Sequence, residues 1–354
     1  MKHLKTLPAL CLIAGLVVLA GVLLGLTHQA DPDRVVIKMG HGLDTFHPVH
    51  RAMLYMAERL EEKSGGTMTI DVYPSEQLGN ERQLVELLQI GSLGMTKVSA
   101  AVMEGFAPVY SLLSVPYLFR DIEHSYEVLD GEIGRELLLS SEPFWLRGLC
   151  FYDAGSRSFY TKDKPILHPD DLAGLKIRVQ ESPSAQRMVS VLGGSPTPIA
   201  WGELYTALQQ GVVDGAENNP PSFYTSQHYK IAPHYSLDEH TAVPDVVLIS
   251  TTIWESLTPQ QQQWLQEAAD ESAVYQRRLW KEASDEALRE VQAAGVTVYH
   301  PDKAPFVEKV QPIYDDYRDS DDPVDQQIYR YIQAIQSMPA SEVGVATEST
   351  PMQP

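Results

Sequence analysis

Two separate strand–helix–strand runs constrain the fold of this chain more than any other feature of its sequence. The first run has a β-branched strand at 35–40, a helix that opens at Pro48, and a strand at 67–73 in which apolar and polar residues alternate. The second run has a strand at 175–179, a helix at 183–192 and an extended segment at 195–199. A further helix is expected at 201–210, with Trp201, Leu204, Tyr205 and Leu208 on its core side. Because strands that alternate with helices are typical of α/β proteins, we predict an α/β fold.

The length and order of the remaining segments predict two lobes. The chain after residue 30 has about 320 residues, which is more than one small core needs. A buried strand is expected at 246–250, and Thr258-Pro259 is expected to cap a long helix that extends to about Ala294. We assign residues 33–152 and about 242–285 to lobe I, and residues 153–241 and about 286–338 to lobe II.

The two ends of the chain differ from this body in composition. Lys2 and Lys5 precede an uncharged apolar run at 7–26, which is typical of an export signal. The run is also long enough to stay in the membrane as an anchor. We therefore predict a signal peptide or anchor at 1–30, a periplasmic body, and a disordered tail at 339–354, where Ser, Thr, Pro and Glu predominate.

Charge and cysteine content exclude several kinds of protein. The chain has 27 basic and 47 acidic residues, a net charge of −20, which would repel a nucleic acid. An anionic ligand would need local arginines inside a cleft. Outside the signal segment the single cysteine is Cys150, so no internal disulfide can form, and its apolar neighbours predict a buried thiol.

Catalytic and metal-binding motifs are absent from the sequence. It has no phosphate loop, no Gly-x-Ser-x-Gly elbow and no Cys/His zinc spacing. His41 and His47 are too weak a pair to predict a metal site, and Asp170-Asp171 fit the start of a helix better than acid–base catalysis. We expect no cofactor, no metal and no enzymatic activity.

Arginines and amides near predicted strand ends are the best candidates for ligand binding. Arg157 lies among small residues, and Asn218 and Asn219 follow a strand. Arg178 lies in another strand, whose neighbouring residues Ile177 and Val179 point the other way. A guanidinium binds a carboxylate through two parallel hydrogen bonds. These residues together would form a carboxylate clamp, although each arginine alone would be equally consistent with a surface ion pair.

Several segments resemble the TRAP transporter solute-receptor family, the DctP-type extracytoplasmic solute-binding proteins. The resemblance extends from about Val35 to Pro301. The matching segments are Gln77–Arg82, Ser114–Arg120, Asp153–Tyr160, His168–Val179, Val213–Pro220 and Pro244–Ser250. It implies a two-lobe periplasmic binding protein fold, with crossover strands and a long helix bridging both lobes. It also implies a small organic acid as ligand and the integral-membrane subunits of a transporter as partners.

The resemblance also implies roles for single residues. Arg178 matches the arginine that holds the substrate carboxylate, and Arg157 matches a second arginine whose role varies. Asn218 matches a polar residue that closes the pocket from the second lobe. The doubling of Asn218 and Asn219 leaves open which amide faces the ligand.

Within that family, the first-lobe segments look most like those of hexuronate binders, which take up glucuronate or galacturonate. Gly40-His41, His47-Pro48 and Gln77–Arg82 carry this likeness. His41, His47 and Glu81 would then contact the sugar hydroxyls. His47 could instead cap its helix, and Glu81 could simply open the next one.

Two alternatives to a uronate receptor remain from the sequence. The first is the same receptor role for a C4-dicarboxylate or another organic acid. The second is a secreted enzyme acting on sugar acids, for which Glu81 and His41 are the one acid–base pair available. A receptor should close by hinge motion near 152–155 and 241–244, whereas a rigid pocket in one lobe would need no closure.

Overall fold

The computed structural model describes residues 34–339. The predicted signal or anchor at 1–30 and all but the first residue of the predicted tail at 339–354 lie outside this range. Within it, no helix combines the length and hydrophobicity that crossing a bilayer requires.

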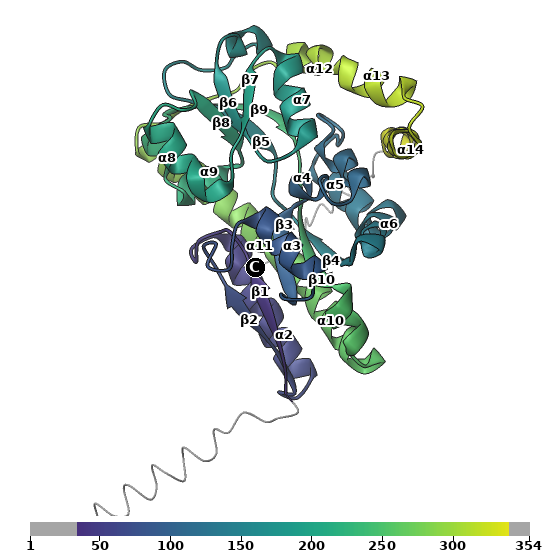
Figure 1. Cartoon of the computed structure of the whole chain (residues 1–354). Helices are drawn as coiled ribbons and strands as arrows, with labels where there is room; N and C mark the ends of the chain where they lie inside the picture. Colours follow the sequence, from purple (N-terminus) through teal and green to yellow (C-terminus); the bar gives the residue numbers. More distant parts are fainter. Residues whose placement is uncertain (1–33, 340–354) are drawn as a thin grey trace, which may run out of the picture.

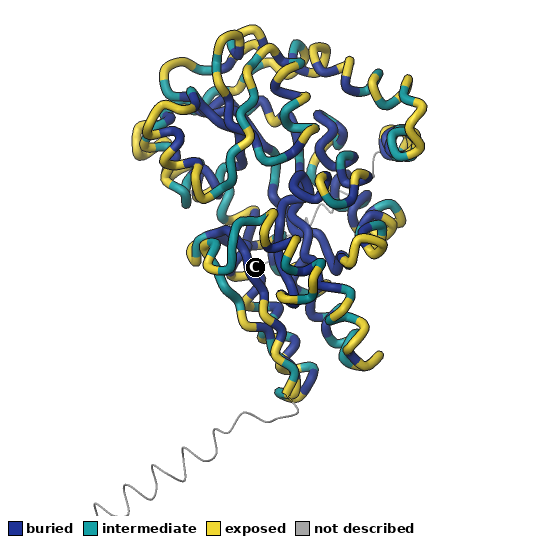
Figure 2. The backbone as a smooth tube through the Cα atoms, viewed as in Figure 1, coloured by how far each residue is buried: buried dark blue, intermediate teal, exposed yellow. Residues whose placement is uncertain are grey.

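The first lobe is built on a five-stranded sheet. Its order is β2-β1-β3-β10-β4, from β1 (Val35–Gly40), β2 (Met68–Tyr73), β3 (Met95–Ser99), β4 (Leu146–Tyr152) and β10 (Asp245–Ser250). β1 pairs in parallel with β2 and β3, and β10 lies antiparallel between β3 and β4. Strands β3, β4 and β10 are almost entirely buried (Figure 2). The strands expected near 35–40, 67–73 and 246–250 are therefore present.

The second lobe is built on a six-stranded sheet. Its order is β11-β9-β5-β8-β6-β7, from β5 (Arg157–Thr161), β6 (Lys176–Val179), β7 (Ser195–Pro198), β8 (Gly215–Asn218), β9 (His234–Thr241) and β11 (Thr297–Tyr299). β6 pairs in parallel with β7 and β8, as the second strand–helix–strand run predicts.

Helices cover both sheets (Figure 1). Those of the first lobe are α2 (Pro48–Lys63), α3 (Glu81–Gln89), α4 (Ala100–Met103), α5 (Ile122–Asp130), α6 (Glu132–Ser140) and α10 (Thr251–Ser256). Those of the second are α7 (Pro183–Leu192), α8 (Leu204–Gln209), α9 (Pro220–Thr225), α12 (Ala304–Lys309) and α13 (Gln311–Asp319). The last helix, α14 (Pro323–Ser337), is described below.

Three connections join the sheets of the two lobes. The chain crosses from β4 to β5 and returns from β9 to β10, so the predicted crossover strands are present. The third is α11 (Pro259–Ala293), which has 35 residues and begins at a capping box formed by Thr258 and Gln261. It packs against α2 and β4 of the first lobe and against α9 of the second (Figure 1). The predicted long bridging helix is thus confirmed.

The final helix corrects the predicted lobe boundaries. We assigned about 286–338 to lobe II, and Phe306 of α12 does belong to a core cluster of the second lobe. However, Ile328, Ile332 and Ile335 of α14 belong to the core of the first lobe. These isoleucines form one apolar face of the helix, and burying that face against the first lobe places α14 there.

Candidate functional site

A cavity lies between the two lobes. The space within it that water-sized molecules can occupy is about 50 Å³, which is below the range of about 300–1,000 Å³ for small-ligand sites, so a sugar-sized ligand needs the lobes to move apart. Six of the seven candidate residues line it, and His41 does not. The six are His47 and Glu81 from the first lobe, with Arg157, Arg178, Asn218 and Asn219 from the second.

Arg178 presents an uncompensated positive charge to the cavity. Its strand neighbours Ile177 and Val179 point into the second-lobe core, so Arg178 lies on the opposite face of β6. Its Nε donates to the Ile199 carbonyl at 2.8 Å, but its Nη1 is buried and has no hydrogen-bond partner within residues 34–339. Burial lowers the pKa of this guanidinium. Since a buried charge without a partner is costly, the site favours an added anion.

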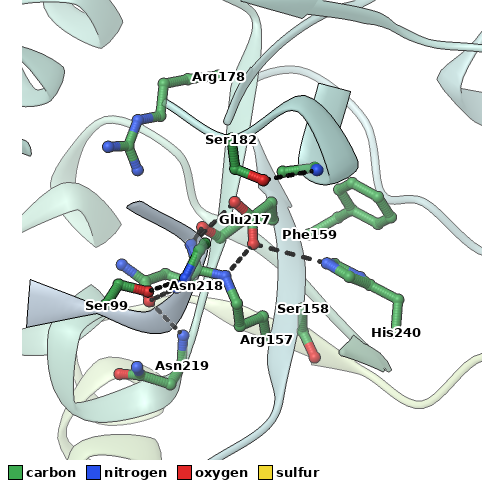
Figure 3. Close-up of polar contacts among 12 residues, drawn as sticks. Ser99, Arg157, Ser158, Phe159, Arg178, Ser182, Glu217, Asn218, Asn219 and His240 are labelled. Atoms are coloured by element: carbon green, nitrogen blue, oxygen red, sulfur yellow. Dashed lines mark hydrogen bonds and ion pairs between the residues drawn. The ribbon is translucent and has the colours of Figure 1, made fainter. Parts of the chain in front are cut away.

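Arg157 lines the same cavity and is buried, but its guanidinium is hydrogen-bonded to other protein groups. Its Nη2 donates to Glu217 Oε1 at 2.8 Å and to the Glu217 carbonyl at 2.9 Å, and its Nη1 donates to Asn218 Oδ1 at 3.0 Å. Its Nε also pairs with the Glu217 carboxylate (Figure 3). Burial opposes the charge of Arg157, but Glu217 outweighs burial and raises its pKa.

Glu217 connects Arg157 to a second buried cation, His240. Burial alone would raise the pKa of Glu217, but Arg157 and His240 hold it at about 2. Burial would likewise lower the pKa of His240, but Asp238 and Glu217 raise it to about 9. His240 Nδ1 lies 2.8 Å from Asp238 Oδ2, and its ring packs on Phe159. This cluster therefore holds two positive and two negative groups beside the crossover strands.

Asn218 and Asn219 both line the cavity. Asn218 Oδ1 accepts from Arg157 Nη1 and from the Asn219 backbone N–H at 2.9 Å. Asn219 Oδ1 accepts from the Ser222 N–H at 2.9 Å and so caps α9. Because both side-chain oxygens are engaged, the Nδ2 group of each is what remains for a ligand.

An ion-paired cluster forms the first-lobe wall. Lys97 Nζ lies 3.0 Å from Asp245 Oδ2 and 3.3 Å from Glu81 Oε1, and Glu81 also accepts from the Ser99 N–H at 3.2 Å. Burial opposes the charge of Lys97, but Asp245 and Glu81 raise its pKa. Glu81 is also the first residue of α3, so it opens its helix, as one of its two interpretations expects, and lines the cavity as well. The sequence analysis missed Lys97 and Asp245, although a lysine inside the buried strand β3 was a usable signal.

The two histidines differ in their relation to the cavity. His47 caps α2 by accepting from the Val49 N–H at 3.3 Å, and its Nε2 lies 3.3 Å from Ser222 Oγ of the second lobe. Burial and Lys97 lower the pKa of His47 to about 3. His41 is instead bonded at Nε2 to His50 and at Nδ1 to the Leu43 N–H. The expected contact of His41 with the ligand is not supported, because both its ring nitrogens are engaged away from the cavity.

Trp201 also departs from the sequence analysis. The expected helix 201–210 is split into a 3₁₀ turn at Trp201–Glu203 followed by α8. Leu204 and Leu208 are buried as expected, whereas Trp201 lines the cavity and Tyr205 is partly exposed. Trp201 packs against a core cluster of each lobe and also lines the cavity, so part of its ring is available to pack on a ligand.

Two first-lobe carboxylates contact the second lobe. Glu104 accepts from Ser182 Oγ at 3.0 Å and from the Ser184 N–H at 3.1 Å, at the start of α7. Glu76 accepts from the Gly202 N–H at 3.1 Å. Together with the contact between His47 and Ser222, these bonds join the lobes around the cavity, so the structure is in a closed form.

Acidic, histidine and cysteine side chains do not assemble a metal centre in the described part of the chain. No group of three that could hold an ion occurs there. The single cysteine of this part, Cys150, is buried as expected, and burial raises its pKa.

Comparison with known proteins agrees with this geometry. Residues 39–320 match the family described as bacterial extracellular solute-binding protein, family 7. A TRAP periplasmic solute-binding protein from Xanthobacter autotrophicus, solved with β-D-galacturonate, is 38% identical, covers 84% of this chain and 99% of its own, and has a TM-score of 0.80. Another from Anaerococcus prevotii, solved with D-glucuronate, is 38% identical, covers 87% and 100%, and has a TM-score of 0.82.

A relative with a different ligand is more distant. The C4-dicarboxylate-binding periplasmic protein DctP of Rhodobacter capsulatus is 30% identical over 86% of this chain and 93% of its own. The family match spans most of the described residues, and both solved structures share the two-lobe fold. The chain therefore belongs to family 7 of the bacterial extracellular solute-binding proteins, the receptors of TRAP transporters.

Proposed function

We propose that this chain is an extracytoplasmic receptor that binds a hexuronate and delivers it to the membrane subunits of a TRAP transporter. The observation that carries the proposal is Arg178, a buried arginine on the cavity wall whose Nη1 has no partner among the described residues. A carboxylate supplies the missing acceptor and the missing charge together.

The rest of the cavity suits a polyhydroxylated acid. The amide donors of Asn218 and Asn219 lie on the same side as Arg178, and the carboxylates of Glu81 and Asp245 lie on the first-lobe side. A sugar ring can accept hydrogen bonds from the amides and donate hydroxyl protons to the carboxylates. The two solved relatives that hold galacturonate and glucuronate support this assignment of ligand class.

Capture would proceed by closure of the lobes. Arg178 and the asparagines belong to one lobe, and Glu81 and His47 belong to the other, so only the closed form contacts both ends of the ligand. The hinge would lie where the chain crosses between β4 and β5 and between β9 and β10. A membrane subunit can then select loaded receptors because ligand favours the closed form.

The enzyme alternative lacks its assembled acid–base pair. Glu81 lies on the cavity but is bonded to Lys97 and the Ser99 N–H. His41 is bonded to His50 away from the cavity, and burial lowers its pKa to about 2, so it is neutral. We therefore propose binding without turnover.

Calorimetric titration tests the function. D-glucuronate and D-galacturonate should each bind saturably at one site, and product analysis after long incubation should recover the unchanged acid. Succinate serves as the dicarboxylate comparison. Tight binding of succinate without binding of either uronate would refute the ligand class, and consumption of a uronate would refute the receptor role.

A further inference from the structure

The first-lobe wall carries more negative than positive charge where it meets the cavity. Glu81 and Asp245 share the single ammonium of Lys97, which leaves a formal charge of −1. The Lys97 side chain is only 2% exposed, whereas the side chains of Glu81 and Asp245 are 17% and 10% exposed. A ligand in the cavity therefore meets carboxylate oxygen before it meets the ammonium.

Each of these two carboxylates uses only one of its oxygens for bonds to the described part of the protein. Glu81 uses Oε1 for Lys97 and the Ser99 N–H, and Asp245 uses Oδ2 for Lys97. Glu81 Oε2 and Asp245 Oδ1 accept no hydrogen bond from the part of the chain that the structure describes. An ionised carboxylate can only accept, so these oxygens suit a hydroxyl and are unfavourable to a second carboxylate.

The other charged groups of the cavity do not compensate for this wall. Arg157 is paired with Glu217, so it brings no net charge. Arg178 is engaged by the first carboxylate of the ligand in the proposed binding mode. The remaining charged residue of the lining, Glu181, is acidic. A second carboxylate would lose its hydration without gaining a cationic partner, at a cost that grows as the site closes.

We propose that Glu81, Lys97 and Asp245 act together as a filter that admits hydroxyls and excludes a second carboxylate at the far end of the ligand. The filter rests on the proposed function, because Arg178 must hold the first carboxylate. It makes monocarboxylate sugar acids the substrate class and rejects aldarates and C4-dicarboxylates. Lys97 is the positioning residue that holds the two carboxylates together despite their mutual repulsion.

A matched pair of ligands isolates the filter from the rest of the site. D-gluconate and D-glucarate are both open-chain acids and differ only in a CH₂OH or a carboxylate at carbon 6. The measured quantity is the ratio of their dissociation constants by calorimetry at neutral pH. The wild type should bind gluconate more tightly than glucarate by roughly tenfold or more, the size expected for two like charges a few ångströms apart in a partly solvated site.

Neutralising the wall should tighten the binding of glucarate and should not tighten the binding of gluconate. Asp245→Asn keeps the shape of the side chain and removes one negative charge, and Glu81→Gln does the same on the other side of Lys97. Each variant should bind glucarate more tightly than the wild type and gluconate no more tightly, so that the ratio falls about tenfold. Glu203→Gln is the control, because Glu203 is exposed close to the cavity without lining it, and the ratio should not change.

The outcomes separate the filter from the function. If the wild type binds glucuronate but does not bind gluconate more tightly than glucarate, the filter is wrong and the function stands. The filter is also wrong if both variants weaken both ligands equally, since that pattern reports a general loss of structure. If one of the two variants, Asp245→Asn or Glu81→Gln, unfolds at a much lower temperature than the wild type, the other serves alone. Both are expected to change the same ratio of dissociation constants. Binding of no uronate by the wild type would overturn both proposals.

Discussion

Arg157 and Arg178 line the same cavity in opposite surroundings. Arg157 directs its guanidinium at Glu217 and Asn218, and every bond it makes stays inside the protein. Arg178 makes one bond to a carbonyl and keeps a buried Nη1 without a partner among the described residues. Figure 3 shows Arg178 standing apart from the bonded cluster around Arg157.

The difference teaches that the partner, rather than the arginine, decides the role. A paired arginine holds strands and amides in place, and its net charge is cancelled. An unpaired one keeps its charge for a ligand. Spacing along the chain could not separate these cases, because Glu217 is 60 residues from Arg157 in sequence. Four predictions test the comparison.

The largest effect should come from breaking the paired arginine. Glu217→Gln leaves Arg157 and His240 without their shared carboxylate, and removing one partner of a buried pair costs roughly 3–5 kcal/mol of unfolding free energy. Denaturant unfolding measures it. Glu181→Gln, on a partly exposed cavity residue that forms no ion pair with any residue of 34–339, should change stability by less than about 0.5 kcal/mol. If both variants unfold like the wild type, the cluster has no structural role.

The unpaired arginine should behave in the reverse manner. Arg178→Ala should cost roughly 2–5 kcal/mol of uronate binding free energy. It should leave the free energy of unfolding largely unchanged, because the bond to the Ile199 carbonyl is the one hydrogen bond that its side chain makes to the described residues. Arg178→Lys should also bind poorly, since an ammonium offers a point charge in place of a fork. Calorimetry that finds Arg178→Lys within about twofold of the wild type would contradict the clamp.

The paired cluster should also give stability a pH dependence that the unpaired arginine does not. The pKa of His240 is raised to about 9, so its contribution is complete below pH 6.5 and is lost as pH rises through about 9. The pKa of Glu217 is lowered to about 2, so its contribution is complete above pH 4.5 and is lost as pH falls through about 2. Unfolding free energy should fall by about 3 kcal/mol from pH 6.5 to above 9.

His240→Gln provides the check on that slope. The variant should be less stable than the wild type at pH 6.5, and its stability should vary less between pH 6.5 and 9. Melting curves at matched ionic strength measure both. An unchanged slope would mean that another group titrates in this range.

The smallest effect concerns the contacts that close the lobes. Glu104→Gln removes the charge that accepts from Ser182 and the Ser184 N–H, and it should weaken uronate binding by about 1 kcal/mol. Glu86→Gln, on the exposed face of α3, is the control. Small-angle scattering should show a radius of gyration that falls on ligand addition. An unchanged profile alongside calorimetrically proven binding would favour a rigid pocket.

Much of the fold could be predicted because local signals suffice for it. The β-branched run at 35–40 forms β1, and Thr258-Pro259 caps α11. The strand position of Arg178, between two core residues, likewise predicted a side chain facing away from the core. In each case the pattern lies within a few residues of the feature that it predicts.

The rest of the site depends on pairing between distant strands. β10 lies antiparallel to β3 with Asp245 opposite Ser99 and Val247 opposite Lys97, and this register brings Asp245 to Lys97. No local signal reports a register between strands so far apart in sequence. The same reason explains why α14 was assigned to the wrong lobe. The apolar face of this helix predicts that it packs against a core, but it does not predict which lobe supplies that core.

The strand order of the first sheet has a consequence for the time course of folding. β10 lies between β3 and β4, yet it is made only after the entire stretch from β5 to β9. The second sheet can form most of its strand pairs from that unbroken stretch. The first sheet cannot be completed before β10 is made, and the core of the first lobe cannot be completed before α14 is made. Because long loops close slowly, we expect protection of amide protons from exchange to appear first in β5 and β8 and last in β3 and β4. The lobe that contains the first strands of the chain is therefore the last to complete its folding.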